Sequence, residues 1–580
     1  MKLSRTGYIL GVTIYMLILS ACTFKPTSQK ETPQSTTTPI FSKFTYQGSD
    51  AIYKENPLAE NEFYTPILQG CYPDPSITRK GNDYYLINSS FVFYPGVPIF
   101  HSTDLVNWTQ IGHVLDRPSQ LKLEGVKMSG GIYAPDISYN PHNETFYMVT
   151  THIGGGLGNI VVKAKDPAKE WSDPIKLAFD GIDPALFFDD DGKAYLIHND
   201  EPVKALYDGH RVIKMWEYDV ENDQVIGTGK VIVDGGVDIT QKPIWIEGPH
   251  IYKKDDVYYL MCAEGGTGGN HSEVVFKSTS VMGPYVPAEK NPILTQRHLP
   301  KDRPYRVEWA GHADLVSTPE GVYYGVFLGC RPNEAGYVNT GRETYILPVD
   351  WSGEFPVFKG GLEPLSVKLP LPTGAKNETG KDGFMPNGNF TFEDNFDASF
   401  FDYRWISVRG FYNDFASMTP SGLQIIPANV KLEKDKTSPS MLCFRQQHNA
   451  FTAETTLHYI PETETHLAGI ACMQNENFNY VLGVTIIEED KYHLVLTKTA
   501  EGNTSIISTV PVTDITLPIK LQVSAQGNDY RFDYAVGEDA EYINIGGTVS
   551  GDILSTNVAG GFTGCLIGLY ATTANDTLHP

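Results

Sequence analysis

The chain has 580 residues, which is too long for one ordinary hydrophobic core, so two large domains are expected. It carries 45 basic and 69 acidic residues, and the net charge of −24 argues against nucleic acid or an anionic membrane surface as a partner. The 54 glycines, 38 prolines, 33 tyrosines and 28 phenylalanines, with only 20% charged residues, are typical of a turn-rich all-β protein.

Residues 1–22 have the pattern of an export signal. A basic start precedes an apolar run over residues 8–19 that is short for a membrane span, and the following "LSAC" resembles a bacterial lipobox ending at Cys22. We therefore expect an exported bacterial lipoprotein, periplasmic or at the cell surface, that touches the membrane only through a lipid on Cys22. The alternative is an ordinary signal peptide. Residues 23–60, which open with a polar stretch rich in Pro and Thr, are predicted to form a flexible tether.

Five similar segments then follow along the chain. Each has a short apolar strand, a polar turn and a second strand that carries an aromatic residue. The segments begin at Asp74, Ala134, Asp183, Gly248 and His312. These starts are 60, 49, 65 and 64 residues apart, a spacing typical of the blades of a β-propeller. We predict a five-bladed β-propeller over residues 61–362, and the alternative is an open sandwich with coincidentally similar hairpins.

Residues at the same place in each propeller repeat converge near the axis, because the innermost strand of every blade begins there. Asp74, Asp183 and His312, together with Glu247 just before Gly248, would therefore meet at the mouth of one channel. Like charges gathered in an apolar funnel raise the pKa of at least one carboxyl group. Two carboxyl groups facing a scissile bond are the basic equipment of glycoside hydrolysis, and a third can hold the acid and raise its pKa.

Three segments resemble the signatures of glycoside hydrolase family 43: "YPDPSI", "IDPALFFDDDGKAYL" and "IEGPHIYKKDDVYYL". The likeness runs from about residue 62 to the C-terminus and is closest to the two-domain β-xylosidases and α-L-arabinofuranosidases of that family. It implies an inverting mechanism, with Asp74 as general base, Asp183 as the residue that tunes and orients the acid, and Glu247 as general acid. Inversion requires the two reacting carboxyl groups to stand roughly 6.5–9.5 Å apart.

The same resemblance implies further pocket residues. Phe91 and Tyr133 match aromatic walls around the terminal sugar. Many relatives have tryptophan in place of Tyr133, and this difference leaves the choice between xylose and arabinose as the substrate sugar open. His312 matches a pocket histidine that in some relatives faces a water-coordinated calcium ion; its alternative is a core histidine. Arg342 matches an arginine that contacts substrate hydroxyls; its alternative is an ion pair with Glu343 or Glu247. No metal ligand set and no required cofactor is predicted otherwise.

Residues 363–389 form a connector rich in Gly, Pro and Asn, and strands that alternate apolar and polar residues follow over 390–580. This pattern predicts an antiparallel β-sandwich of lectin-like type, which either covers one face of the propeller or binds carbohydrate. The stretch 558–572 resembles the segment that sends an aromatic side chain to the active-site rim in two-domain relatives. Phe562 is therefore a predicted lid residue that narrows the pocket.

We expect an inverting exo-glycoside hydrolase that releases xylose from the non-reducing ends of xylo-oligosaccharides of the plant cell wall. The alternatives are an α-L-arabinofuranosidase acting on arabinoxylan or arabinan side chains, an endo-arabinanase, a non-catalytic glycan-binding propeller, and a phosphorolytic propeller with Arg331 and Arg342 as phosphate ligands. GxSxG, Walker, HExxH and paired Cys/His metal patterns are absent from the sequence. The oligomeric state is not predicted.

Overall fold

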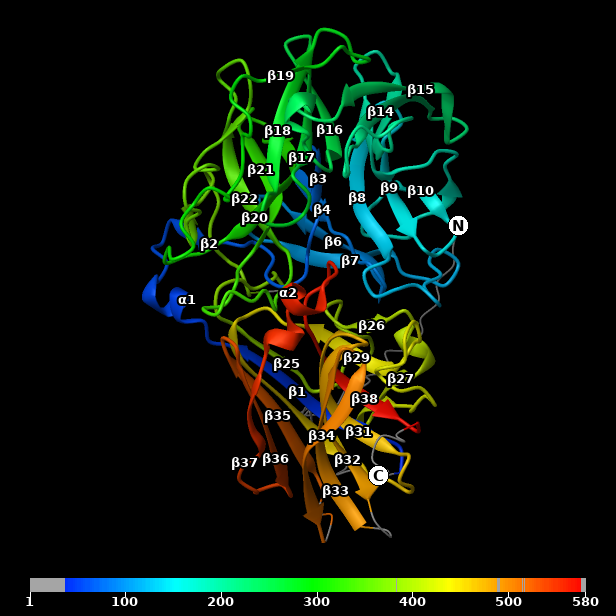
Figure 1. Ribbon diagram of the computed structural model, residues 1–580, viewed down its shortest axis with the longest axis vertical. Coiled ribbons are helices and arrows are strands. Elements are labelled where there is room, and N and C mark those ends of the chain that lie inside the picture. Colours follow the sequence, from blue (N-terminus) through cyan, green and yellow to red (C-terminus); the bar gives the residue numbers. More distant parts are fainter. Residues whose placement is uncertain (1–36, 382, 488–490, 514, 516, 575–580) are drawn as a thin grey trace, which may run out of the picture.

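A computed structural model describes residues 37–574 except 382, 488–490, 514 and 516. It consists of a β-propeller above a β-sandwich, which meet along a broad seam (Figure 1). This confirms the predicted fold class. The expected signal peptide and Cys22 lie outside the described residues. Within the described part of the chain, no helix reaches the length and apolarity needed to cross a bilayer.

The propeller has five blades, each an antiparallel sheet of four strands in meander order. Blade one consists of β3 (Ser76–Lys80), β4 (Asp83–Ile87), β6 (Gly96–Ser102) and β7 (Thr109–Leu115). Blade two consists of β8 (Gly131–Asn140), β9 (Thr145–Ile153), β10 (Gly158–Ala164) and β11 (Ile175–Lys176). Blade three consists of β12 (Ile182–Phe188), β13 (Ala194–Asp200), β14 (Val212–Asp219) and β15 (Gln224–Asp234). Blade four consists of β16 (Glu247–Lys254), β17 (Val257–Glu264), β18 (Ser272–Ser278) and β19 (Val286–Pro287). Blade five consists of β20 (Glu308–Ser317), β21 (Tyr323–Cys330), β22 (Glu343–Asp350) and β23 (Val357–Phe358).

The first strands of the five blades, β3, β8, β12, β16 and β20, contact one another in a closed ring around the axis. The hydrophobic core lies between neighbouring blades; Ile99 of blade one, for example, packs with Ile137 and Phe146 of blade two. Each blade is built from one continuous stretch of the chain, in blade one with β5 looped out, so no blade joins the two ends of the propeller. Instead, β2 (Glu62–Tyr64) pairs with β24 (Lys368–Pro370), and the segment after β2 hydrogen-bonds to blade five.

The structure corrects the predicted tether. β1 (Ile40–Gly48) is a strand of the sandwich, paired with β28 and β30, and the short helix α1 (Ala51–Glu55) follows it. Phe41, Phe44 and Tyr46 of this strand are fully buried. Their partners are hundreds of residues away in the sequence, so the local composition carried no sign of the pairing. A tether reaching residue 60 was therefore wrong from residue 40 onward.

The predicted linker 363–389 is also not a free connector. It contains β24 and is packed along the propeller, with Leu365, Val367 and Met385 buried. Apolar side chains scattered between Gly, Pro and Asn gave no periodic signal, although they are sufficient to fix the segment on the propeller surface. The sandwich then begins close to the predicted boundary, with β25 (Thr391–Asp394).

The sandwich has two antiparallel sheets that face each other across one large core. In order, the first sheet contains β27 (Ala416–Thr419), β28 (Gly422–Ile425), β1, β30 (Ala450–His458), β35 (Ile519–Gln526), β36 (Asp529–Val536) and β37 (Ile543–Ser550), with β25 paired to β1. The second contains β34 (Asn503–Val512), β33 (Lys491–Ala500), β32 (Phe478–Ile487), β31 (Leu467–Asn475), β38 (Leu566–Thr572), β29 (Ser440–Arg445), β26 (Ile406–Val408) and β5 (Phe93–Tyr94). The sandwich also contains the short helix α2 (Thr556–Ala559) and the 3-10 turns η2 (Tyr412–Asp414) and η3 (Asp552–Leu554), while a third 3-10 turn, η1 (Ile239–Gln241), lies between blades three and four.

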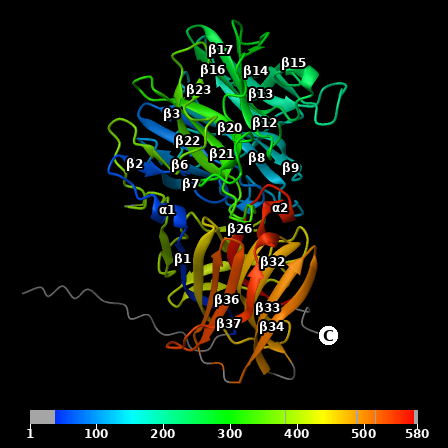
Figure 2. The same ribbon diagram turned by 60° about the vertical axis from the view of Figure 1, so that its left-hand side comes forward.

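Several features join the domains. β5 leaves blade one to become an edge strand of the second sandwich sheet, and α2 lies at the seam against the propeller (Figure 2). The six cysteines in the described residues are all buried and unpaired, as expected for buried thiols.

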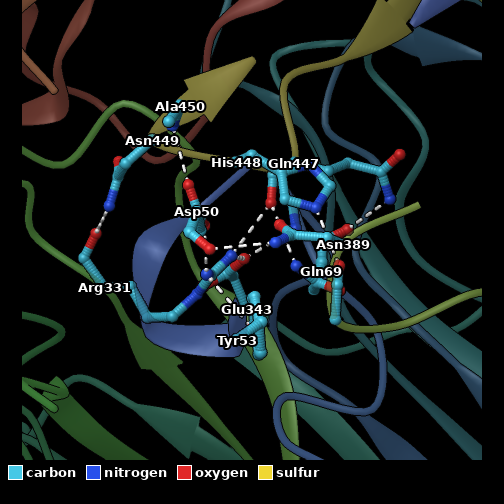
Figure 3. A network of polar contacts seen from close by, with 12 residues as sticks. Asp50, Tyr53, Gln69, Arg331, Glu343, Asn389, Gln447, His448, Asn449 and Ala450 are labelled. Carbon is cyan, nitrogen blue, oxygen red and sulfur yellow. Dashed lines mark hydrogen bonds and ion pairs between the residues drawn. The ribbon is translucent and has the colours of Figure 1, made fainter. Parts of the chain in front are cut away.

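A buried ion-pair network centred on Arg331 lies at the same seam (Figure 3). Its guanidinium donates to both carboxylate oxygens of Glu343, over 2.6 and 2.7 Å, and to Asp50 over 3.1 Å. Asp50 in turn accepts from the backbone N–H of Ala450 in the sandwich, over 2.7 Å. The N-terminal segment, blade five and the sandwich are thus held together at one point. Arg331, one of the two candidate phosphate ligands, is thus buried in this network and does not line the axial cavity.

Candidate active site

The five positions singled out as repeat starts share an unusual backbone conformation. Their φ angles are 50° at Asp74, 27° at Ala134, 53° at Asp183, 55° at Gly248 and 55° at His312. In blades two to five the pairing of the first two strands shifts register at this point. Bulges of this kind redirect side chains, and left-handed conformations of non-glycine residues gather at functional sites. The repeated motif therefore uses a left-handed backbone position in each blade to direct side chains toward the axis.

All eight predicted site residues line a single axial cavity of about 410 Å³. They are Asp74, Phe91, Tyr133, Asp183, Glu247, His312, Arg342 and Phe562. Seven come from the propeller, and Phe562 comes from the sandwich. Residues from all five blades and from the second domain thus meet in one pocket, as the rotational argument from the sequence predicted.

Asp74 is buried and held by two partners. Arg342 donates to its two carboxylate oxygens over 2.7 and 3.4 Å, and the Ser89 hydroxyl donates to it over 2.6 Å. Burial alone would raise the pKa of Asp74, but Arg342, His312 and the Ser89 hydrogen bond hold it below its ordinary value. Asp74 is therefore ionised at neutral pH. The predicted alternative for Arg342 was wrong, because its ion pair is with Asp74 and not with Glu343 or Glu247.

The pKa values of Asp183 and Glu247 are shifted in the opposite direction, above their ordinary values. Burial, followed by the charge of Asp74, raises the pKa of Asp183 to about 7, although a hydrogen bond from the Gly248 N–H opposes this. Burial and the charges of Asp183 and Asp74 raise the pKa of Glu247 well above its ordinary value. Asp74 is thus kept ionised and Glu247 is kept protonated, while Asp183 titrates near neutral pH between them. Acid and base roles are separated in this way in sites that perform both steps.

Three aromatic rings form one wall of the cavity. The ring centroids of Phe91, Tyr133 and Phe562 lie 5.8 to 6.2 Å apart, and the Arg342 guanidinium is 5.4 Å from the Phe562 ring. Ser129 ties the wall together, since its carbonyl accepts from the Tyr133 hydroxyl and its own hydroxyl accepts from the Phe562 N–H, over 2.6 and 2.9 Å. Phe562 is thus fastened to the propeller at the position expected of a lid.

Reasoning from the sequence missed part of the cavity lining. Ile182, Trp245, Gly266 and Thr267 also line it, and Thr267 accepts a hydrogen bond from Arg342 over 3.1 Å. Thr267 belongs to the loop "GGTGGN", whose glycines carry no chemical signal of their own. Ile182 and Trp245 precede Asp183 and Glu247 by one and two residues, and that proximity was the only available clue.

A second polar layer lies on the axis beneath the cavity. His250 Nδ1 is 3.5 Å from Asp136 and 3.8 Å from Asp314, and the Ser76 hydroxyl hydrogen-bonds to both carboxylates. Burial lowers the pKa of His250, but the two carboxylates outweigh it and raise the value to about 9. The three residues are close enough to hold a metal ion, yet a protonated imidazole offers no lone pair to one. We interpret this layer as a buried ion-pair plug.

The axial space beneath His312 is a poor fit for a calcium ion. The axial space beneath His312 measures about 10 Å³, which is room for about one water molecule. Calcium takes about six to eight oxygen ligands, so a hydrated ion would need far more space. Burial lowers the pKa of His312 to about 4, and the neutral ring lies against Gly248, where an added Cβ would be 2.9 Å away.

A five-bladed propeller that gathers three carboxyl groups with divergent pKa values around a sugar-sized pocket defines a glycoside hydrolase. The chain belongs to glycosyl hydrolases family 43, which residues 63–356 match. Residues 393–579 match the beta xylosidase C-terminal concanavalin A-like domain, in agreement with the lectin-like sandwich predicted.

Named relatives share both domains. A xylosidase/arabinosidase of Butyrivibrio fibrisolvens is 38% identical, over 88% of this chain and 96% of its own. A non-reducing end alpha-L-arabinofuranosidase of Bacteroides ovatus is 34% identical, over 89% of this chain and 92% of its own. Among solved structures, a GH43_12 protein from a capybara gut metagenome is 55% identical, with a TM-score of 0.88 over 92% of this chain and 99% of its own.

Proposed function

We propose that the protein is an inverting exo-hydrolase that releases a terminal pentose, xylose in the first instance, from the non-reducing ends of plant cell-wall oligosaccharides. The observation that carries this proposal is the split in protonation between Asp74, ionised by Arg342, and Glu247, kept protonated by burial and neighbouring charge. A glycan receptor without catalytic activity would have no use for such a split.

In the proposed reaction, Asp74 accepts a proton from a water molecule whose oxygen attacks the anomeric carbon. The bond from that carbon to the leaving oxygen breaks, and Glu247 donates its proton to the leaving oxygen. Asp183 stays beside Glu247 and raises its pKa by charge, so that the acid remains protonated near neutral pH. The Arg342 guanidinium balances the negative charge of the Asp74 carboxylate before it accepts the proton.

Exo action is supported by the shape of the site. Phe562 and the Ser129 contacts close the aromatic side of the cavity, which leaves space for one or two sugar units at a chain end and not for a continuous polymer. An endo-arabinanase needs a cleft open on both sides, and a phosphorolytic enzyme needs a basic phosphate site. Of the two candidate phosphate ligands, Arg331 is engaged at the domain seam and Arg342 at Asp74.

The second candidate is α-L-arabinofuranose release. It is favoured by the names of the Butyrivibrio and Bacteroides relatives. The deciding experiment is a screen of aryl β-D-xylosides against aryl α-L-arabinofuranosides with the purified protein. Hydrolysis of neither would overturn the proposed function, and the ratio of the two kcat/KM values assigns the sugar.

We further propose that the enzyme needs no metal or cofactor, which is supported by the poor fit of calcium beneath His312. Activity retained within about twofold after exhaustive chelation is expected; a loss restored by calcium would overturn this point.

For the cell, we propose a lipoprotein exported by the signal in residues 1–22 and anchored by a lipid on Cys22. Radiolabelled palmitate should enter the native protein and not the Cys22→Ala variant, and labelling of neither would contradict the anchor.

A further inference from the structure

The proposed acid defines which side of the cavity holds the leaving group. A general acid must face the leaving oxygen, so the sugar that departs lies beyond Glu247. Phe91, Tyr133 and Phe562 form the aromatic side of the same cavity, where the proposed function places the terminal sugar. Four other residues from blades three and four line the cavity: Ile182 and Trp245, which precede Asp183 and Glu247 by one and two residues, and Gly266 and Thr267.

Trp245 stands out in this group because its conformation is strained and supported from two sides. Its φ angle is 52°, a left-handed value that a bulky side chain rarely adopts. Its N–H donates to the carbonyl of Gly209 in the blade-three loop over 2.9 Å, and the carbonyl of the preceding Ile244 accepts from Gly265 over 2.9 Å. Two loops thus hold one partly exposed indole at the cavity rim.

Arg211 supports the ring itself. Its guanidinium lies 4.1 Å from the centre of the Trp245 ring, and Glu201 fixes the guanidinium through an ion pair of 3.1 Å. Arg211 is also close to Glu247. Burial and the charge of Asp183 raise the pKa of Glu247, and the positive charges of Arg342 and Arg211 partly oppose this rise. A planar cation over one face of an indole restrains the ring, and the other face can then stack on the apolar face of a sugar.

We propose that Trp245 is the platform for the leaving sugar and determines preference for oligosaccharides over glycosides with small leaving groups, and that Arg211 is the positioning residue of this platform. The inference rests on the proposed function, because the direction of the leaving group follows from the acid role of Glu247. The ligand is the next sugar unit of the chain, bound by stacking.

The test compares a disaccharide with the methyl glycoside of the same terminal pentose, using whichever pentose the wild-type enzyme hydrolyses. Both substrates need Glu247 to protonate an alkoxide, but only the disaccharide places a sugar on Trp245. We expect Trp245→Ala to lower kcat/KM on the disaccharide by about tenfold or more and on the methyl glycoside by less than about threefold. Arg211→Ala should follow in the same direction with a smaller effect, and Arg211→Lys should recover part of the loss.

The matched control is Arg404→Ala, which removes another guanidinium that lies 4.1 Å from an aromatic ring, that of Phe392 in the sandwich. Arg404→Ala should leave kcat/KM unchanged on both the disaccharide and the methyl glycoside. Equal losses on both substrates in Trp245→Ala would mean that Trp245 acts on the acid or on folding, and an unchanged disaccharide rate would mean that it binds nothing; either result overturns the platform. Failure of the wild type on every pentoside would instead overturn the proposed function.

Discussion

Arg342 and Asp74 lie 268 positions apart in the chain, yet their side chains form a hydrogen-bonded ion pair of 2.7 Å. Blade five and blade one therefore meet at Asp74, the proposed catalytic base. Glu343, the residue after Arg342, points into the Arg331 network that binds the sandwich. The base is thus connected through two adjacent residues to the seam between the domains.

The charge of Arg342 should set the acidic limb of the pH profile. Asp74 must be ionised to act as base, so kcat/KM falls as pH drops through its pKa, which Arg342 holds below the ordinary value. In Arg342→Met the pKa of Asp74 should rise, and the acidic limb should move to higher pH by about one unit or more, together with a large loss of activity. Measurements of kcat/KM between pH 3 and 8 give the shift. If the acidic limb lies at the same pH in both proteins, the limb does not report the ionisation of Asp74.

Loss of the proposed acid should depend on the leaving group. Glu247→Gln should lower kcat on disaccharides by about 10²-fold or more, while glycosides of nitrophenols, which leave without protonation, should lose much less. Circular dichroism and the melting temperature should match the wild type. Turnover of disaccharides near the wild-type rate would remove Glu247 from the acid role.

Phe562 is the residue through which the sandwich should contribute to substrate binding. Phe562→Ala removes the ring that contacts Phe91 and Tyr133, so kcat/KM should fall by about tenfold through weaker binding of the terminal sugar. Phe400→Ala, which truncates a ring of the same domain with 68% of its surface exposed, is the control and should have no effect. If both variants behave like the wild type, the sandwich contributes no lid.

The axial plug should be a stability element that is sensitive to alkali. His250→Ala leaves Asp136 and Asp314 buried without their cation, and breaking such a pair costs about 3–5 kcal/mol. Because folding raises the pKa of His250 to about 9, its contribution is fully present below about pH 6.5 and is lost as pH rises through 9.

Urea unfolding from pH 6 to 10 tests this account of the plug. The wild type should lose stability in this window, and the difference between wild type and His250→Ala should shrink as pH rises. His298→Ala, at an exposed histidine, is the control. A difference independent of pH would contradict a charged His250.

The sequence predicted what is encoded in local repeats. Five hairpins with matching starts placed Asp74, Asp183 and Glu247 on one axis, because rotational symmetry converts equal positions in the repeats into neighbours in space. The resemblance to a family added Phe91, Tyr133, Arg342 and Phe562, which no local pattern distinguishes from core residues.

What escaped prediction depends on contacts across long sequence separations. β1 pairs with β30 about 400 residues away, so its apolar face looked like part of a tether. Trp245 becomes a pocket residue only because loops of two blades hold it at a positive φ. The Arg331 network likewise joins three separate segments, none of which signals its partners in the sequence.

The most direct test of the arrangement is the anomer that the enzyme forms first. Proton NMR should follow the hydrolysis of a xyloside, or of an arabinofuranoside if that is the substrate, within the first minutes, before mutarotation. If Asp74 activates a water molecule on one face of the sugar while Glu247 protonates the leaving oxygen on the other, as proposed, the first product should have the inverted configuration. A first product with retained configuration would show that a carboxylate attacks the sugar directly, and would contradict the roles given to these residues.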